Sequence, residues 1–163
     1  MADKAASVFP AVQFSQAKTG LSELMTTVVH THTLEVIERH GGKEAAVLMA
    51  REDLLALLDG YRFSPRVALD ENEATAALED FGILGFGETS EEAMEDLVVE
   101  LRAYSQRVLV DERDFYAQTD RARHVPWLLR FALTPPEDQI ELLYADSHAE
   151  VEALAVGEGE TAA

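Results

Sequence analysis

The order of apolar and polar residues near the start of the chain predicts a short strand followed by a helix. Residues 12–14 alternate as a half-buried strand does, and Ser15 then stands where a helix N-cap is expected. Apolar side chains recur at helical spacing after Ser15 and define one inner face, which consists of Ala17, Leu21, Leu24, Met25 and Val28. The pattern therefore predicts one strand and one capped helix in direct succession.

A β-hairpin and a second helix are predicted next. Two β-rich runs, 33–39 and 44–49, flank the turn His40-Gly41-Gly42-Lys43, and paired glycines supply the positive φ that a tight hairpin needs. The following run, 51–58, begins with acidic residues, which favour a helix N-terminus. The apolar positions expected to be buried on this helix are Leu54, Leu55, Leu57 and Leu58.

The middle of the chain predicts three short strands and the longest helix. Two strands are expected on either side of the polar turn 70–73, with Val67 and Leu69 in the first, and a third strand is expected over 81–86. Thr89 and Glu92 then form a capping box at the start of the long helix. The apolar stripe of this helix consists of Ala93, Leu97, Leu101, Tyr104 and Val108.

Beyond Val110 the chain is helical in composition, with a polar break at 119–124. Pro126 suits the first turn of one helix, and the run 134–137 is expected to cap and open a last helix. These patterns predict two modules, 1–60 and 66–145, joined by a connection that contains Gly60 and Pro65. Residues 146–163, rich in Glu, Gly and Ala, predict a disordered acidic tail.

Composition excludes several classes of site. The 163 residues contain no cysteine, which excludes a disulfide framework, a thiol nucleophile and any Cys-ligated metal, and favours a cytoplasmic location. No apolar run approaches the ~20 residues of a membrane span, and the first ten residues lack a secretory core. We therefore expect no membrane contact and no cofactor.

The net charge of −18 is distributed unevenly. Up to Ser64 there are six Lys and Arg against eight Asp and Glu, whereas from Pro65 onward there are seven against 23. Because DNA binding depends largely on neutralising phosphates, any DNA contact is expected in the first module. The acidity of the rest favours either solubility alone or the attraction of a basic partner.

The first module resembles the Phd/YefM-type antitoxins. The stretches VQFSQAKTGLSELMTTV and LEVIERHGGKEAAVLMAREDLLALL carry the resemblance, which covers roughly the first 60 residues. Lys18 stands where the family usually has Arg, and the hairpin turn is one residue longer than the commonest form. The matching positions are Phe14, Ala17, Lys18, Leu21, Leu24, Ile37, Arg39, Ala46, Val47 and Leu48.

The second module is similar to HicB-like domains. The string LGFGETSEEAMEDLVVELRAY matches their Gly-x-Gly-x-Thr-x-x-Glu-Ala-x-x-x-Leu segment, and the resemblance covers about 40 residues. It implies a small α/β antitoxin lobe with a partial RNase H-like sheet. The fold class expected is α+β, with a Phd/YefM-like strand–helix–hairpin–helix dimerisation module followed by a HicB-like lobe and C-terminal helices.

The Phd/YefM resemblance implies candidate DNA contacts, because two copies of such a module pair and face one palindromic operator. By position, these contacts are Ser15, Gln16, Lys18 and Thr19 on the first helix and Arg39 at the strand end, with His40 and Lys43 nearby in the turn. A lysine favours phosphate, and a glutamine can hydrogen-bond a base edge. The alternative is that these residues are only solvated helix and hairpin positions.

The apolar residues of the C-terminal helices have two interpretations. Either they pack onto the second module, or they form an amphipathic surface that grips a toxin with aromatic anchors. The candidate partner contacts are Trp127, Leu128, Phe131, Ile140, Leu143 and Tyr144.

Three other patterns do not predict a site. His30, His32 and His40 suggest a metal, but metal sites usually recruit ligands besides histidine. The carboxylates at 111–114 are typical of an exposed helix end, and the glycine-rich run 82–87 lacks the Lys-Ser/Thr of a phosphate-binding loop. No nucleophile, base and orienting group can be assembled, so an enzyme is not expected.

The predicted function is that of an antitoxin of a type II toxin–antitoxin system. Such a protein neutralises a cognate protein toxin by direct binding and represses its own operon as a homodimer or higher oligomer bound to operator DNA. Two alternatives stay open: a stand-alone transcriptional regulator without a toxin, and an oligomeric adaptor that binds no DNA.

Overall fold

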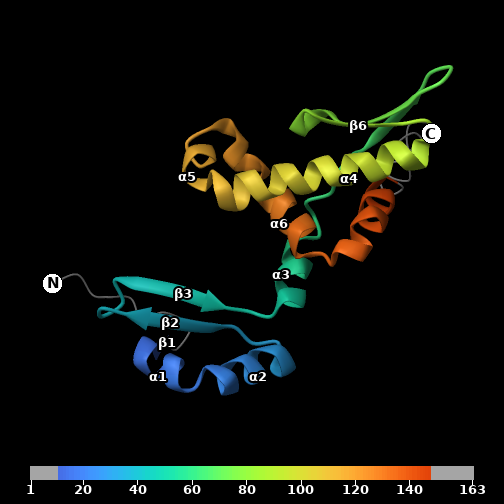
Figure 1. Ribbon diagram of the computed structural model, residues 1–163. Coiled ribbons are helices and arrows are strands. Elements are labelled where there is room, and N and C mark those ends of the chain that lie inside the picture. Colours follow the sequence, from blue (N-terminus) through green and yellow to red (C-terminus); the bar gives the residue numbers. More distant parts are fainter. Residues whose placement is uncertain (1–10, 148–163) are drawn as a thin grey trace, which may run out of the picture. The chain divides into compact units, whose positions relative to one another are not determined.

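The computed structural model describes residues 11–147, which divide into two compact units (Figure 1). Unit 1 is the described part of Met1–Leu57, and unit 2 is the described part of Leu58–Ala163. Unit 1 contains β1 (Ala11–Gln13), α1 (Phe14–Thr19), α2 (Leu21–Thr31), β2 (Glu35–Arg39), β3 (Glu44–Leu48) and nearly all of α3 (Arg51–Leu58). The order strand, helix, hairpin, helix agrees with the sequence-based expectation for this part of the chain.

The sheet of unit 1 has the order β1-β2-β3. β1 and β2 are parallel, and the crossover between them consists of α1 and α2, as a parallel pair requires. β2 and β3 form the predicted antiparallel hairpin, in which Arg39 lies opposite Glu44. His40, Gly41 and Gly42 all have positive φ, which confirms the role expected of the paired glycines.

Two details of the first helix differ from the prediction. The backbone leaves the extended region at Gln13, so the helix begins at Phe14, and Ser15 lies inside it instead of capping it. The single helix expected is also divided at Gly20, whose N–H donates to the carbonyl of Gln16 at 2.9 Å before α2 begins at Leu21. Glycine at this position interrupts the helix because it adds backbone freedom and no side chain that packs.

The apolar face of unit 1 is only partly buried. Ala17, Val28 and Ala50 are buried, but Leu21 and Met25 remain about half exposed. Leu57 is 68% exposed, so the prediction that it is buried is wrong. A three-stranded sheet with short helices offers too little surface to cover these side chains, because a unit of this size buries a smaller fraction of its surface than a larger domain does.

Unit 2 has a three-stranded sheet followed by helices. Its elements are β4 (Arg66–Leu69), β5 (Ala74–Leu78), β6 (Ile83–Gly87), α4 (Ser90–Gln106), a π-helical segment (Arg107–Asp111), α5 (Arg113–Tyr116), α6 (Val125–Leu133) and a last helix over 139–147. Short 3₁₀ turns cover Glu79–Phe81, Asp120–His124 and Pro136–Asp138. The third strand therefore begins two residues later than predicted, after Gly82 with φ 65°.

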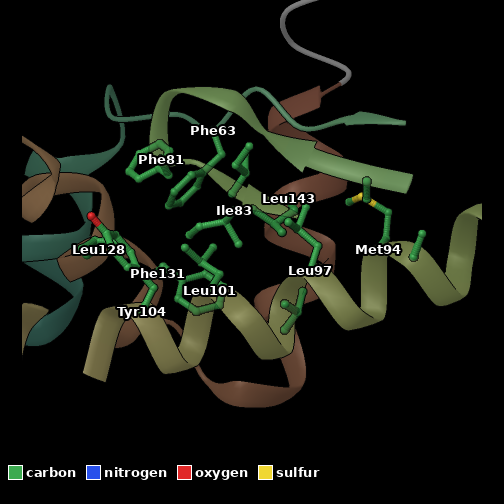
Figure 2. Packing of buried hydrophobic residues seen from close by; sticks show 14 of the residues in the cluster. Phe63, Phe81, Ile83, Met94, Leu97, Leu101, Tyr104, Leu128, Phe131 and Leu143 are labelled. Carbon is green, nitrogen blue, oxygen red and sulfur yellow. The ribbon is translucent and has the colours of Figure 1, made fainter. Parts of the chain in front are cut away.

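The core of unit 2 lies between the sheet and the helices (Figure 2). The strands form an antiparallel sheet of order β4-β5-β6, and α4 packs against it. Every member of the predicted stripe is buried, which confirms the periodicity read from the sequence, although the last member, Val108, lies in the π-helical segment that follows α4. Figure 2 shows Leu97 and Leu101 of α4 directed toward Phe63 and Ile83.

The glycine-rich run before α4 has a packing role. A Cβ at Gly85 would collide with the backbone of α4 at Ala93 and Leu97, and one at Gly87 would collide with Glu92. Glycine therefore lets β6 approach α4 more closely than any other residue would allow. The predicted cap follows, because the Oγ1 of Thr89 accepts from the N–H of Glu92 at 3.2 Å.

A buried ion pair holds the last helix in unit 2. Arg130 of α6 donates to both carboxylate oxygens of Asp146, at 2.6 and 3.0 Å, and Asp146 also accepts from the backbone N–H of Phe63. Asp146 is only 2% exposed and lies in the helix 139–147. The prediction that a disordered tail starts at this residue is therefore wrong, while the rest of the expected tail, 148–163, lies outside the described residues.

Candidate functional site

An apolar hollow of about 590 Å³ lies in unit 1 between the first helices and the hairpin. Two of the candidate DNA contacts, Lys18 from α1 and Arg39 from β2, contribute to its lining. The other lining residues are Phe14, Ala17, Leu21, Ile37, Glu38, Glu44, Ala45 and Ala46. The structure thus brings two cations to one mostly apolar surface, although 21 residues separate them in sequence.

The two cations of this hollow differ in how they are held. The Nε of Arg39 donates to the carboxylate of Glu44, and its guanidinium lies 5.9 Å from the ring centroid of Phe14, a cation–π distance. Lys18 is exposed and forms no ion pair with the residues that the structure describes. A phosphate would therefore meet a free ammonium at Lys18 but would have to compete with Glu44 for Arg39.

The remaining candidate DNA contacts are exposed but do not line the hollow. Ser15, Gln16 and Thr19 lie on α1, where the hydroxyl of Thr19 donates to the carbonyl of Ser15 at 3.0 Å. His40 and Lys43 lie in the turn between β2 and β3. All of them are accessible to a ligand, and their roles stay predictions.

The candidate partner contacts lie mostly inside unit 2. Leu128, Phe131 and Leu143 are fully buried in the core, so the prediction that they form an exposed surface does not hold for them. The other three, Trp127, Ile140 and Tyr144, are half-buried and pack against the same core. The physical reason is that these helices bury their apolar faces against the core of unit 2. This packing is the other interpretation that the sequence left open.

Sequence reasoning missed an apolar surface on the sheet of unit 2. Leu84 and Phe86 of β6 are 48% and 50% exposed, whereas Ile83 and Gly85, which alternate with them, are buried. Period-two alternation in the string ILGFG is the signal that could have indicated it, because neighbouring strand residues point to opposite faces. Both faces of this strand carry apolar residues, so the polar face of an ordinary amphipathic strand is missing.

A second hollow, of about 320 Å³, lies in unit 2 near His124. His124 is buried, shares a 2.9 Å hydrogen bond with the hydroxyl of Tyr104, and its Nε2 has no partner among the described residues. Burial lowers the pKa of His124, and the positive charges of Arg123 and Arg121 lower it further. Burial also raises the pKa of Tyr104, so both groups stay neutral at pH 7.

We expect the stability of the protein to fall as the pH is lowered through His124's usual pKa of about 6.5. Below that pH the unfolded chain takes up a proton that the folded state, with its lower pKa, still resists. Replacing His124 with Asn should flatten this part of the curve of unfolding free energy against pH. Urea unfolding of the wild type and of this variant between pH 5 and 8 measures the effect, and the same pH dependence in both proteins would contradict it.

Among residues 11–147, no cluster of three His, Asp or Glu side chains that could hold a metal ion occurs. His32 instead lies 3.0 Å from the carboxylate of Asp53. Within the same range, no helix is long and apolar enough to cross a membrane.

Comparisons with known proteins identify the family. A family model described as PHD_like, "Antitoxin of toxin-antitoxin, RelE / RelB, TA system", matches residues 9–145, while comparison with curated proteins found no match. A crystal structure from Syntrophomonas wolfei subsp. wolfei, proposed to be the antitoxin part of a toxin/antitoxin system, has a similar fold, with a TM-score of 0.69 and 17% identity. The likeness covers 82% of this chain and 96% of that one. Because the family match runs through both units, the chain belongs to the PHD_like family of antitoxins of toxin–antitoxin systems.

Proposed function

We propose that this protein neutralises a cognate protein toxin by direct binding and represses its own operon as a dimer on operator DNA. Family membership supports the antitoxin role. The observation that carries the dimer and the DNA contact is the exposed apolar hollow of unit 1, lined by Lys18 and Arg39. In this proposal the protein acts by stoichiometric binding in the cytoplasm, without a cofactor or a membrane.

The dimer is inferred from what unit 1 leaves exposed. Phe14, Leu21, Met25 and Val29 from the first helices are 44–50% exposed, in a unit whose buried apolar residues are few. Burying such apolar surface against a second chain would stabilise a dimer by about 25 cal/mol for each Å² removed from water. A second copy of unit 1 is the occupant that the resemblance to Phd/YefM-type antitoxins implies.

DNA binding is assigned to unit 1 on charge. The sequence up to Ser64 is nearly balanced, whereas the sequence from Pro65 onward carries most of the −18 charge and would repel phosphates. A dimer of unit 1 doubles the cationic groups of Lys18 and Arg39, and a palindromic operator would match its two-fold axis. Unit 2, whose sequence is similar to HicB-like domains, is then the part available to hold the toxin.

Replacing both Lys18 and Arg39 with Ala should weaken operator binding at least about tenfold. It should also make binding less dependent on salt, because the slope of log affinity against log salt falls by about one for each phosphate that the variant no longer neutralises. An electrophoretic mobility shift with the protein's own upstream DNA at two salt concentrations measures both effects. The variant Arg51→Ala/Arg66→Ala removes the same charge elsewhere on exposed side chains and serves as the control.

The outcomes separate the proposal from its alternatives. Equal reductions of affinity in both variants would mean that net charge, not these two side chains, determines the affinity. No specific shift of the wild-type protein at low salt would favour an adaptor that binds no DNA. Specific binding together with failure to retain the product of the adjacent reading frame in a pull-down would favour a regulator without a toxin.

A further inference from the structure

The sheet of unit 2 has two faces with different surroundings. Residues opposite one another in an antiparallel pair share a face, so the register assigns each side chain to one side. On the inner face, Ala74, Ala76, Leu78, Ile83 and Gly85 of β5 and β6 are buried against the core, whereas Val67 and Leu69 of the edge strand β4 share this face and are 42% and 72% exposed. The opposite, outer face consists of Arg66, Ala68, Thr75, Ala77, Leu84 and Phe86.

Four of the six residues on the outer face are apolar, namely Ala68, Ala77, Leu84 and Phe86. Thr75 lies opposite Phe86, and Ala77 lies opposite Leu84, so the two large side chains stand beside small ones with no long polar residue between them. Leu84 and Phe86 are each about half exposed. No described element of unit 2 packs on this face, since α4 and the later helices lie on the other side of the sheet (Figure 1).

Acidic side chains border this face at one end. The register puts the turn 70–73 next to the end of β6, because Leu69 pairs with Ala74 and Ala74 pairs with Gly87. The exposed carboxylates that gather at this end belong to Asp70, Glu71, Glu73 and Glu88. Arg66 is the only cation in these three strands, and it lies 3.8 Å from Glu79.

We propose that the outer face of the β4-β5-β6 sheet docks the toxin, and that the toxin surface it binds is an apolar patch flanked by Lys and Arg side chains. This inference rests on the proposed function and names the surface that carries it out. Leu84 and Phe86 are the anchors, because they are the two large apolar side chains of this face and binding would remove their exposed apolar area from water. The carboxylates beside Phe86 pair with the toxin's cations, raise the association rate and orient the complex.

The same charges argue against a second copy of this chain as the occupant. Face-to-face pairing of two unit 2 sheets would bring together two chains of net charge −18, each with an acidic turn beside its apolar face. A basic partner would instead be attracted by the same carboxylates. Charge complementarity thus selects the toxin from among the possible occupants.

The test compares two matched double variants of the full-length protein. Leu84→Thr/Phe86→Thr removes the two anchors and keeps residues that favour strands. Val99→Thr/Phe115→Thr is the control, because Val99 on α4 and Phe115 on α5 are 55% and 63% exposed and lie outside the sheet. The probe is the protein encoded by the adjacent reading frame, co-expressed, purified and titrated against each variant by calorimetry.

We expect the sheet variant to bind this protein at least tenfold more weakly than the wild type, and the control variant to bind within about twofold. The expected result also includes an unchanged melting temperature and an unchanged mass in solution for both variants. Wild-type affinity in the sheet variant would overturn the inference while leaving the proposed function intact. A wild-type chain that fails to bind the probe would overturn the proposed function, and the inference with it.

The same experiment would also reveal whether a second copy of the chain, or another part of the same chain, covers this face. Dissociation of the sheet variant into smaller species would mean that a second copy covers this face. A melting temperature lowered in the sheet variant by several degrees, relative to the control, would mean that another part of the same chain covers it. Either result overturns the proposal.

Discussion

Replacing Asp146 with Ala should lower the free energy of unfolding by about 3–5 kcal/mol, the cost expected when one partner of a buried ion pair is removed. The guanidinium of Arg130 would be deprived of both short hydrogen bonds while remaining buried at 7% exposure of its side chain. The N–H of Phe63 would also be left without its acceptor. The last helix would no longer be tied to α6 and to the chain segment that precedes β4.

Urea unfolding followed by the fluorescence of Trp127, the only tryptophan, measures this change within unit 2. Glu79→Ala is the matched control, because its ion pair with Arg66 is exposed and should contribute no more than about 1 kcal/mol. The double variant Arg130→Met/Asp146→Leu replaces the pair by apolar groups and should recover much of the stability. Equal effects of Asp146→Ala and Glu79→Ala would contradict the structural role of the buried pair.

Replacing Gly85 with Ala should destabilise unit 2 by about 3 kcal/mol, the upper part of the range for overpacked cores. The added methyl group would overlap backbone atoms of Ala93 and Leu97, which a change of rotamer cannot move. β6 would have to move away from α4 and open the interface that buries Leu97 and Ile83. The loss of stability is expected to be large because the added methyl group overlaps backbone atoms, which cannot move aside as a flexible side chain could.

Gly60→Ala provides the comparison for this variant. A Cβ at Gly60 meets no atom within 4 Å, so the same chemical change there should alter the free energy of unfolding by less than about 1 kcal/mol. Thermal unfolding of both variants, monitored by far-ultraviolet circular dichroism, tests the difference. Similar melting temperatures for the two variants would show that β6 and α4 tolerate a wider separation.

Local patterns predicted the elements that depend on short-range chemistry. The hairpin at His40-Gly41-Gly42-Lys43, the N-cap at Thr89 and the buried helical stripe are confirmed, whereas the second half of the capping box is not, because Glu92 accepts from the N–H of Glu88 instead of that of Thr89. Each depends on residues a few positions apart, where φ preference, a side-chain oxygen and helical periodicity decide the structure. The antitoxin assignment is likewise confirmed, because the family match covers the stretches that carry the resemblance.

The candidate sites depended on contacts that the sequence did not specify. Phe131 and Leu143 have the same apolar character on a buried face as on a binding face, and only packing placed them in the core. In the sequence, Asp146 looks like the start of an acidic tail. Only the structure shows that Arg130, 16 residues away, lies within hydrogen-bond distance of it. Leu84 and Phe86 were overlooked because a strand that is apolar on both faces does not reveal which face the helices cover.

The sequence by itself determined where most helices and strands form, the uneven charge of the two halves, and the family to which the chain belongs. Tertiary structure alone decided which apolar faces are covered, that Gly85 is needed for the approach of β6 to α4, and that Lys18 and Arg39 line one hollow. The reason is one of range. Backbone preference and periodicity act over a few residues, whereas burial depends on which distant segments pack together. A single sequence does not reveal these tertiary contacts.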